Sequence, residues 1–170
     1  MLTAQEGEYM RMILVHFDEA PLRVFGDGDV LLREGDKTGH LYALVEGRLV
    51  VLRGDTEVAL LTEPGSLIGE MAVLLDSPHT ATVRAVGQAK VRAVEDGASF
   101  LSSHPGLSLL LARLLARRLN AATTYLVDIK QQFTGAGNHL ELVGEVLETL
   151  MHQQGINTSH SASDRDGYMD

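Results

Sequence analysis

The residues best suited to bind a ligand lie in one short segment, residues 64–83. Within it, Gly69 and Glu70 begin a run of helix-forming residues that extends to Leu75 and ends near Pro78. The first turn of a helix leaves backbone N–H groups without intrahelical acceptors, and such groups bind anions. Gly69 has no side chain to bar a ligand from this backbone, whereas the Glu70 carboxylate accepts hydrogen bonds from hydroxyl groups. The pair predicts a ligand in which a phosphate and a sugar hydroxyl lie side by side.

Composition excludes several other kinds of chemistry. The chain has 170 residues and no cysteine, which excludes disulfides, thiolate nucleophiles and zinc sites that need sulfur. None of the seven histidines lies in an HExxH pattern, and no serine lies in a Gly-x-Ser-x-Gly elbow. We therefore expect a protein that is not an enzyme and that has no cofactor or metal.

Charge and hydropathy indicate where the protein acts. The net charge is −9, from 14 basic and 23 acidic residues, which is the wrong sign for coating a nucleic-acid backbone. The N-terminus lacks the basic flank of a secretory signal, and no apolar run approaches the ~18 residues that span a bilayer. We expect a cytoplasmic protein that binds neither nucleic acid nor membrane.

Short runs rich in Val and Leu, separated by glycines, surround the ligand-binding segment. Such runs are typical of strands joined by tight turns, which favours antiparallel pairing in a sandwich, barrel or roll. The fold class that we expect is mainly β with flanking helices. The predicted strands are residues 22–25, 30–33, 41–46, 48–53, 57–61, 81–86 and 89–95.

Three helices are predicted outside the strands: residues 4–17, a long helix that begins at Pro105, and residues 139–152. Ser102 and Ser103 offer capping hydroxyls for the long helix, and proline fits its first turn. One apolar stripe of the long helix continues for six turns, further than one small core needs, so we predict a homodimer through residues 105–133. The stripe is Leu111, Leu115, Leu119, Ala122, Leu126, Ile129 and Phe133, and a second, shorter one is Leu107, Leu110 and Leu114.

Two motifs in this setting carry a resemblance to a known family. Gly69-Glu70-Met71-Ala72 is followed by Pro78-His79-Thr80-Ala81-Thr82, and the upstream strands contain residues 25–36, Tyr42 and Gly47. From Phe25 to Ile129 the chain resembles the cyclic nucleotide-binding domain of catabolite-activator-type transcription factors, cyclic-nucleotide-dependent kinases and gated channels. The resemblance implies a double-stranded β-helix, a jelly-roll-like β-roll, followed by a long C-terminal helix.

The resemblance also implies which residues bind the ligand, cAMP or cGMP. Glu70 would accept a hydrogen bond from the ribose 2′-hydroxyl, backbone amides would hold the cyclic phosphate, and Thr123 and Thr124 would contact the base. The full set is Gly69, Glu70, Met71, Ala72, His79, Thr80, Ala81, Thr123 and Thr124.

Position 79 departs from the family pattern, because the arginine that clamps the phosphate is replaced by His79. Imidazole offers at most one directed donor, whereas arginine offers a permanent charge and a two-pronged fork. The loss of one charge-assisted hydrogen bond typically weakens binding roughly ten- to hundredfold. Because a bound phosphate favours charged imidazole, we expect tighter binding at lower pH.

The expected organisation is an N-terminal helix (1–20), a β-roll (21–98), a long hinge and dimerisation helix (99–134), an accessory helix (135–154) and a disordered tail (155–170). The 36 residues after Thr134 are too few for a winged helix-turn-helix, so we expect a stand-alone module without a DNA-binding domain. Such a module would signal through an effector protein in trans.

Alternative interpretations remain open. The pocket is degenerate if His79 cannot replace arginine, and the chain is then a ligand-independent dimerisation or adaptor domain. Glu70 is then only a buried helix-capping acid, and the two threonines are ordinary surface residues. A more distant alternative is a cupin-type metal enzyme, because His40, Tyr42 and Glu46 share one strand face, although two ligands do not make a stable site.

Overall fold

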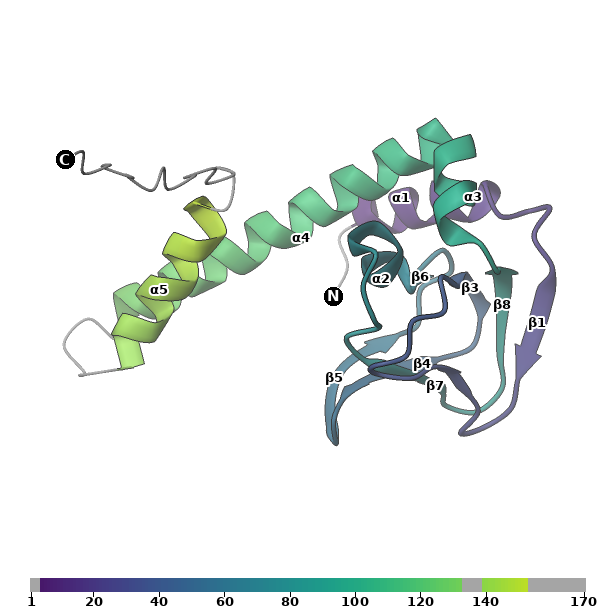
Figure 1. Ribbon diagram of the computed structural model, residues 1–170, viewed down its shortest axis with the longest axis horizontal. Coiled ribbons are helices and arrows are strands. Elements are labelled where there is room, and N and C mark those ends of the chain that lie inside the picture. Colours follow the sequence, from purple (N-terminus) through teal and green to yellow (C-terminus); the bar gives the residue numbers. More distant parts are fainter. Residues whose placement is uncertain (1–3, 133–138, 153–170) are drawn as a thin grey trace, which may run out of the picture. The chain divides into compact units, whose positions relative to one another are not determined.

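The structure is a computed structural model, and it describes residues 4–132 and 139–152 (Figure 1). The chain divides into two compact units, residues 1–116 and residues 117–170. The first unit contains all the strands. Among the described residues, no helix is long and apolar enough to cross a bilayer.

Eight strands form two antiparallel sheets of four strands each. Their order is β1-β8-β3-β6 in one sheet and β2-β7-β4-β5 in the other. This arrangement confirms the predicted mainly-β roll, and every strand except β6 was predicted to within about one residue at either end. The strands are β1 Leu22–Phe25, β2 Val30–Leu32, β3 Leu41–Glu46, β4 Leu49–Arg53, β5 Thr56–Leu61, β6 Leu67–Ile68, β7 Thr82–Ala85 and β8 Ala89–Val94.

One hydrophobic core is built from residues of both sheets. Leu44 and Val91 come from the first sheet and Leu49 from the second, and all three are fully buried. Alternate strand positions supply these residues, because successive side chains of a strand point to opposite faces. The core includes Leu31, Leu32, Tyr42, Leu44, Leu49, Ile68, Val83, Ala85, Ala89, Val91 and Ala93.

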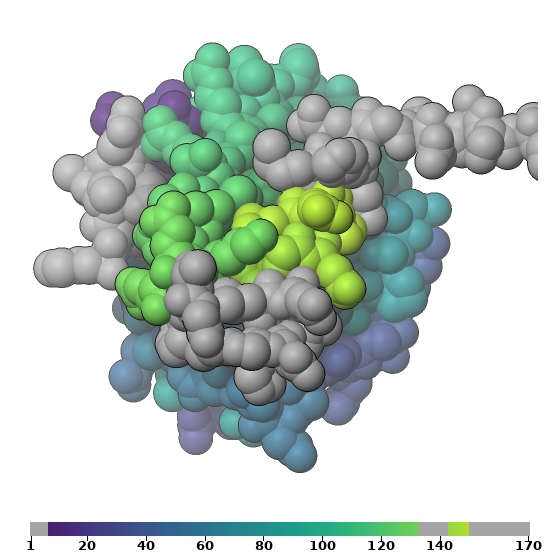
Figure 2. All heavy atoms as spheres, turned by 90° about the vertical axis from the view of Figure 1, so that its left-hand side faces the viewer, coloured from purple at the N-terminus to yellow at the C-terminus, as the bar shows by residue number. Residues whose placement is uncertain are grey.

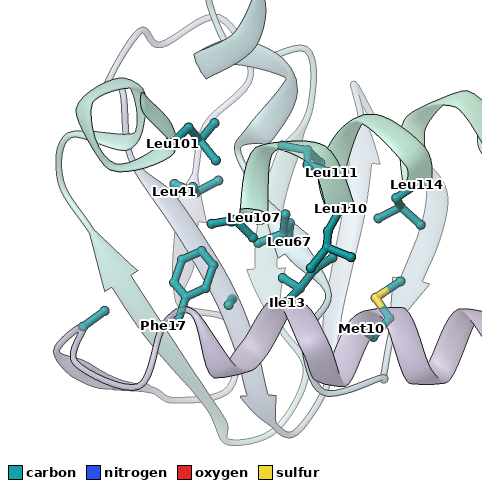
Figure 3. Packing of buried hydrophobic residues seen from close by; sticks show 12 residues of the cluster. Met10, Ile13, Phe17, Leu41, Leu67, Leu101, Leu107, Leu110, Leu111 and Leu114 are labelled. Atoms are coloured by element: carbon teal, nitrogen blue, oxygen red, sulfur yellow. The ribbon is translucent and has the colours of Figure 1, made fainter. Parts of the chain in front are cut away.

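A second core joins the helices to the first sheet (Figure 3). It is formed by α1 (Ala4–Val15), α3 (Gly97–Ser103) and the first turns of α4 (Pro105–Gln132), which pack on β3 and β6. α1 crosses so close to the chain before β6 that a Cβ on Gly65 would lie 1.8 Å from the backbone oxygen of Met10. Glycine is therefore required there. The largest fully buried side chains of this core are Ile13, Phe17, Leu41, Leu107 and Leu111.

The segment predicted as one long helix, residues 99–134, contains two helices in the described part. α3 ends at Ser103 and α4 begins at Pro105. The serines predicted to cap α4 do not do so, because the Ser102 hydroxyl donates to Ala98 O at 2.9 Å and the Ser103 hydroxyl to Phe100 O at 3.0 Å. Both serines thus bond to carbonyls of α3.

The N-terminal helix is also shorter than predicted. It ends at Val15, two residues before the expected end, and the chain then turns through hydrogen bonds such as Phe17 N to Leu14 O at 2.9 Å. Phe17 nevertheless occupies the core as predicted, in ring contact with Phe100 at 4.9 Å between centroids.

The second unit contains the second half of α4 and α5 (His139–His152). α5 lies along α4 in both views (Figures 1 and 2), and a Cβ on Gly144 would lie 3.4 Å from the Lys130 Nζ atom. No side chain at positions 115–132 or 143–149 is buried. The shorter stripe, Leu107, Leu110 and Leu114, thus packs against the roll together with Leu111, the first residue of the longer stripe. The predicted tail and Phe133 lie outside the described residues.

Candidate ligand-binding site

A six-residue helix, α2 (Glu70–Leu75), carries the first predicted motif. Gly69 precedes it with φ of 92°, in the left-handed region that favours glycine. A Cβ at this position would lie 2.4 Å from the backbone oxygen of His40 and 3.3 Å from Leu32 Cδ1. Glycine is therefore needed both for the backbone conformation and for the close approach to the neighbouring chain.

The first turn of α2 presents the amides that the sequence predicts. The first bond of the helical pattern runs from Val73 N to Gly69 O at 3.2 Å, so the amides of Glu70, Met71 and Ala72 precede it. Glu70 is buried, at 8% exposure, whereas Met71 is 44% exposed. A turn that contains a buried carboxylate residue and three such amides can offer an acceptor for a hydroxyl and donors for an anion.

The other end of α2 is fixed by an ion pair. Asp76 adopts a left-handed conformation with φ of 48°, and its carboxylate lies 2.7 Å from the Lys37 Nζ atom. Lys37 also donates to the backbone oxygen of Asp76 at 2.9 Å. The hydrogen bond and the positive charge from Lys37 lower the pKa of Asp76. Lys37 is therefore engaged at the C-terminal end of α2, away from the amides of the first turn.

His79 is buried, at 4% exposure, and its backbone is held on both sides. Its N–H donates to Asp36 O at 2.8 Å, and its carbonyl accepts from Gly35 N at 2.8 Å. The ring atom Nε2 lies 2.8 Å from the Thr38 hydroxyl. Burial lowers the pKa of His79, the nearby His40 lowers it further, and Asp36 opposes the change. The environment thus favours neutral imidazole.

A chain of contacts joins the two halves of the predicted site. The His40 carbonyl lies against Gly69, the His40 N–H donates to the Thr38 hydroxyl at 3.2 Å, and Thr38 reaches His79. Thr38 was not among the predicted site residues. Its partner His79 lies 41 positions away along the sequence, and a local sequence pattern cannot predict a contact between residues so far apart.

The residues of the cupin alternative have other partners. The Tyr42 hydroxyl lies 3.2 Å from His40 Nδ1, and Tyr42 is buried in the core between the sheets, which raises its pKa. The Glu46 carboxylate pairs with Lys90 at 2.7 Å. Within residues 4–132 and 139–152, no three His, Asp or Glu side chains are placed to hold a metal ion.

The second motif lies before and at the start of β7. Thr80 is exposed and Ala81 is half-buried. Arg53, at the end of β4, donates from Nε to the Thr80 carbonyl at 3.2 Å. Glu34 also contacts this region, because its N–H donates to the Thr82 hydroxyl at 3.0 Å. Neither Arg53 nor Glu34 was a predicted site residue, since both contacts join distant parts of the sequence.

The two threonines predicted to contact the base lie on α4 in the second unit. Thr123 is half-buried and Thr124 is exposed. The Thr124 hydroxyl donates to Asn120 O at 2.9 Å, a common bond for threonine within a helix. Their contact with a base stays a prediction.

Comparison with known proteins decides the family. The family model described as the cyclic nucleotide-binding domain matches residues 22–99, which include all eight strands and α2. Residues 22–99 belong to this family. The solved structure of the catabolite activator protein of Thermus thermophilus is similar, with a TM-score of 0.57 and 25% identity over 86% of this chain and 82% of that one.

Two relatives that are similar to parts of this chain are proteins of different kinds. A cAMP-dependent protein kinase regulatory subunit of Dictyostelium discoideum is 38% identical over 73 residues, 39% of this chain and 22% of that protein. Lysophospholipase nte1 of Neurospora crassa is 29% identical over 123 residues, 67% of this chain and 8% of that protein. The chain thus matches only a small part of either relative, and one of the two is an enzyme.

Proposed function

We propose that the domain binds a cyclic nucleotide, cAMP or cGMP, and acts as a regulatory module without catalytic activity of its own. The observation that carries the proposal is the first turn of α2, which contains both the buried residue Glu70 and the amides of Glu70, Met71 and Ala72 that precede the first helical hydrogen bond. A cyclic nucleotide carries an anionic phosphodiester next to a ribose 2′-hydroxyl. It therefore offers an acceptor to the amides and a donor to the carboxylate.

The remaining predicted residues complete the proposed site. The amides of Thr80 and Ala81 would hold the phosphodiester from the β7 side, and Thr123 and Thr124 would contact the base. His79 keeps its place in the proposal as a positioning residue. Its ring atom Nε2 already lies 2.8 Å from Thr38, and its neutral form is favoured.

The proposed output passes through α4. Its first turns pack in the core with α1 and β3, through Leu107 and Leu111, and the same helix continues into the second unit. Binding that shifts the population of roll conformations would therefore bias the position of α4. We place the homodimer contact on this helix and the signal in an effector protein of the cytoplasm.

The role of Glu70 is tested by a thermodynamic cycle that combines a change in the protein with a change in the ligand. Glu70→Gln should weaken binding of cAMP roughly ten- to hundredfold, because the hydrogen bond from the 2′-hydroxyl loses its charged acceptor. 2′-Deoxy-cAMP lacks that hydroxyl, so the same substitution should change its affinity by less than about threefold. Isothermal titration calorimetry of the four combinations measures the coupling. Equal losses for both ligands would contradict the proposed contact.

A further inference from the structure

A phosphodiester bound by the proposed site needs a positive charge, and the obvious candidates do not supply it. Glu70 is acidic, and Lys37 is paired with Asp76 at 2.7 Å. His79 is buried, with a pKa lowered by that burial and by His40. Amide dipoles alone would then face the anion, next to a carboxylate of the same sign as the ligand.

Arg53 lies at the edge of this site by virtue of strand register. β4 pairs with β7 in unbroken register, with Val51 opposite Val83 and Leu52 opposite Thr82. The next position, Arg53, falls on the same face as Val51, which packs against the core between the sheets. The Arg53 guanidinium donates from Nε to the Thr80 carbonyl at 3.2 Å.

A separate pair of hydrogen bonds holds the turn after Arg53 against β7. The Gly54 N–H donates to the Glu34 carboxylate at 2.8 Å, and the Glu34 N–H donates to the Thr82 hydroxyl at 3.0 Å. Glu34 thus ties the end of β4 to the strand that follows Thr80. The position of Arg53 beside Thr80 is therefore fixed by three contacts rather than by one flexible side chain.

We propose that Arg53 supplies the positive charge for the ligand's phosphodiester. This inference rests on the proposed function, because it assigns a residue to the same site. Within the described part of the chain, the Arg53 guanidinium makes one hydrogen bond, through Nε. Its two terminal nitrogens form the fork that suits a pair of phosphate oxygens.

The matched control for Arg53 is Arg84, which is also exposed and lies on the adjacent strand β7. Its neighbours Val83 and Ala85 are buried in the core, so Arg84 points to the opposite face of the sheet. Arg53→Gln and Arg84→Gln each remove one positive charge, and the two residues lie on paired strands, β4 and β7. A difference between them reports local contact rather than net charge.

The test is the affinity of the full chain for cAMP and cGMP, measured by calorimetry at one fixed salt concentration. Arg53→Gln should weaken binding of the preferred nucleotide about ten- to hundredfold, whereas Arg84→Gln should change it less than about threefold. Arg53→Lys should give an intermediate loss, because it keeps the charge without the fork. Thermal melting in the absence of ligand checks that each variant is folded.

The possible failures are distinguishable. If the unmodified chain binds neither nucleotide, the proposed function is overturned and the role of Arg53 falls with it. If the unmodified chain binds and Arg53→Gln matches Arg84→Gln, the role of Arg53 alone is overturned. The two variants match in this sense whether both lose affinity equally or neither loses any.

Discussion

His79 shows how burial changes what a titratable side chain contributes. The resemblance seen in the sequence implies an arginine at position 79, where this chain has an imidazole, and a donor to phosphate was the predicted role of His79. In the structure the imidazole ring lies against Thr38, and the backbone of His79 is hydrogen-bonded to the backbone of Asp36. His79 therefore helps to hold the segment before β7 against the segment before β3. The desolvation that accompanies this packing opposes the charged form.

The lowered pKa of His79 predicts a pH dependence of stability. The unfolded chain takes up a proton near pH 6.5, whereas folded His79 resists protonation until a lower pH. Below about pH 6.5 the unfolded state therefore binds more protons, and the free energy of unfolding decreases as the pH falls. Thermal melts of the unliganded protein at pH 7.5 and pH 5.5 should show the lower melting temperature at pH 5.5.

The variant His79→Gln isolates this contribution, because its amide can bond to Thr38 but does not titrate. It should lose a smaller fraction of its stability between the two pH values than the unmodified chain. A drop of equal size in both proteins would show that other groups cause the pH dependence. Under the proposed function, a phosphate bound near His79 would act in the opposite direction, because it would favour protonation of the imidazole.

For individual residues, the sequence predicted the residue types of the site but not the residues that they contact. Gly69, Glu70 and His79 stand out through local spacing. Thr38 and Arg53 do not, because their contacts depend on how distant segments meet in the folded roll. Their roles follow only from the folded arrangement.

The strands were the most predictable elements. Glycine turns at short intervals and alternating apolar residues mark strand ends, and these two signals act locally. β6 was missed because it has only two residues, Leu67 and Ile68, inside the segment predicted for ligand binding. α3 was merged with α4, although the Asp96 side chain caps it by accepting from Ser99 N at 3.0 Å.

The two apolar stripes of α4 differ in how far along the helix their residues are buried. Leu107, Leu110 and Leu114 are buried in the core with α1, and so is Leu111 at the start of the longer stripe. Leu119, further along that longer stripe, is 49% exposed. A leucine left exposed on a long amphipathic helix is typical of a surface that packs against another helix. This supports the proposed homodimer, which stays a prediction.

The proposed dimer is tested by Leu119→Glu. Burial of each leucine is worth about 1.5–3 kcal/mol, and a symmetric dimer buries two, so the dissociation constant should rise roughly a hundredfold or more. Leu109→Glu is the control, because Leu109 is 53% exposed on the same helix but belongs to neither stripe. Light scattering coupled to size-exclusion chromatography should give a monomer for Leu119→Glu and a dimer for the control. A monomeric unmodified chain, or a dimeric Leu119→Glu variant, would contradict the contact.

At the scale of the whole molecule, the two units differ in how they are stabilised. The first unit has two hydrophobic cores around its sheets, whereas none of the side chains at positions 117–132 and 143–149 of the second unit is buried. Helix pairs without a core gain most of their stability from further packing. The second unit is thus the part of the molecule in which a partner surface, from a second copy or an effector, would have the largest effect.

The central claim is that this protein binds a cyclic nucleotide at the site that begins with α2. Calorimetric titration of the full chain with cAMP, cGMP and the open-ring control 5′-AMP tests it most directly. We expect a dissociation constant in the micromolar range or lower for at least one cyclic nucleotide, which corresponds to a binding free energy of roughly −8 kcal/mol or more negative. The binding of 5′-AMP should be much weaker. No binding of cAMP or cGMP at millimolar concentration would contradict the claim and would leave a ligand-independent dimerisation or adaptor domain.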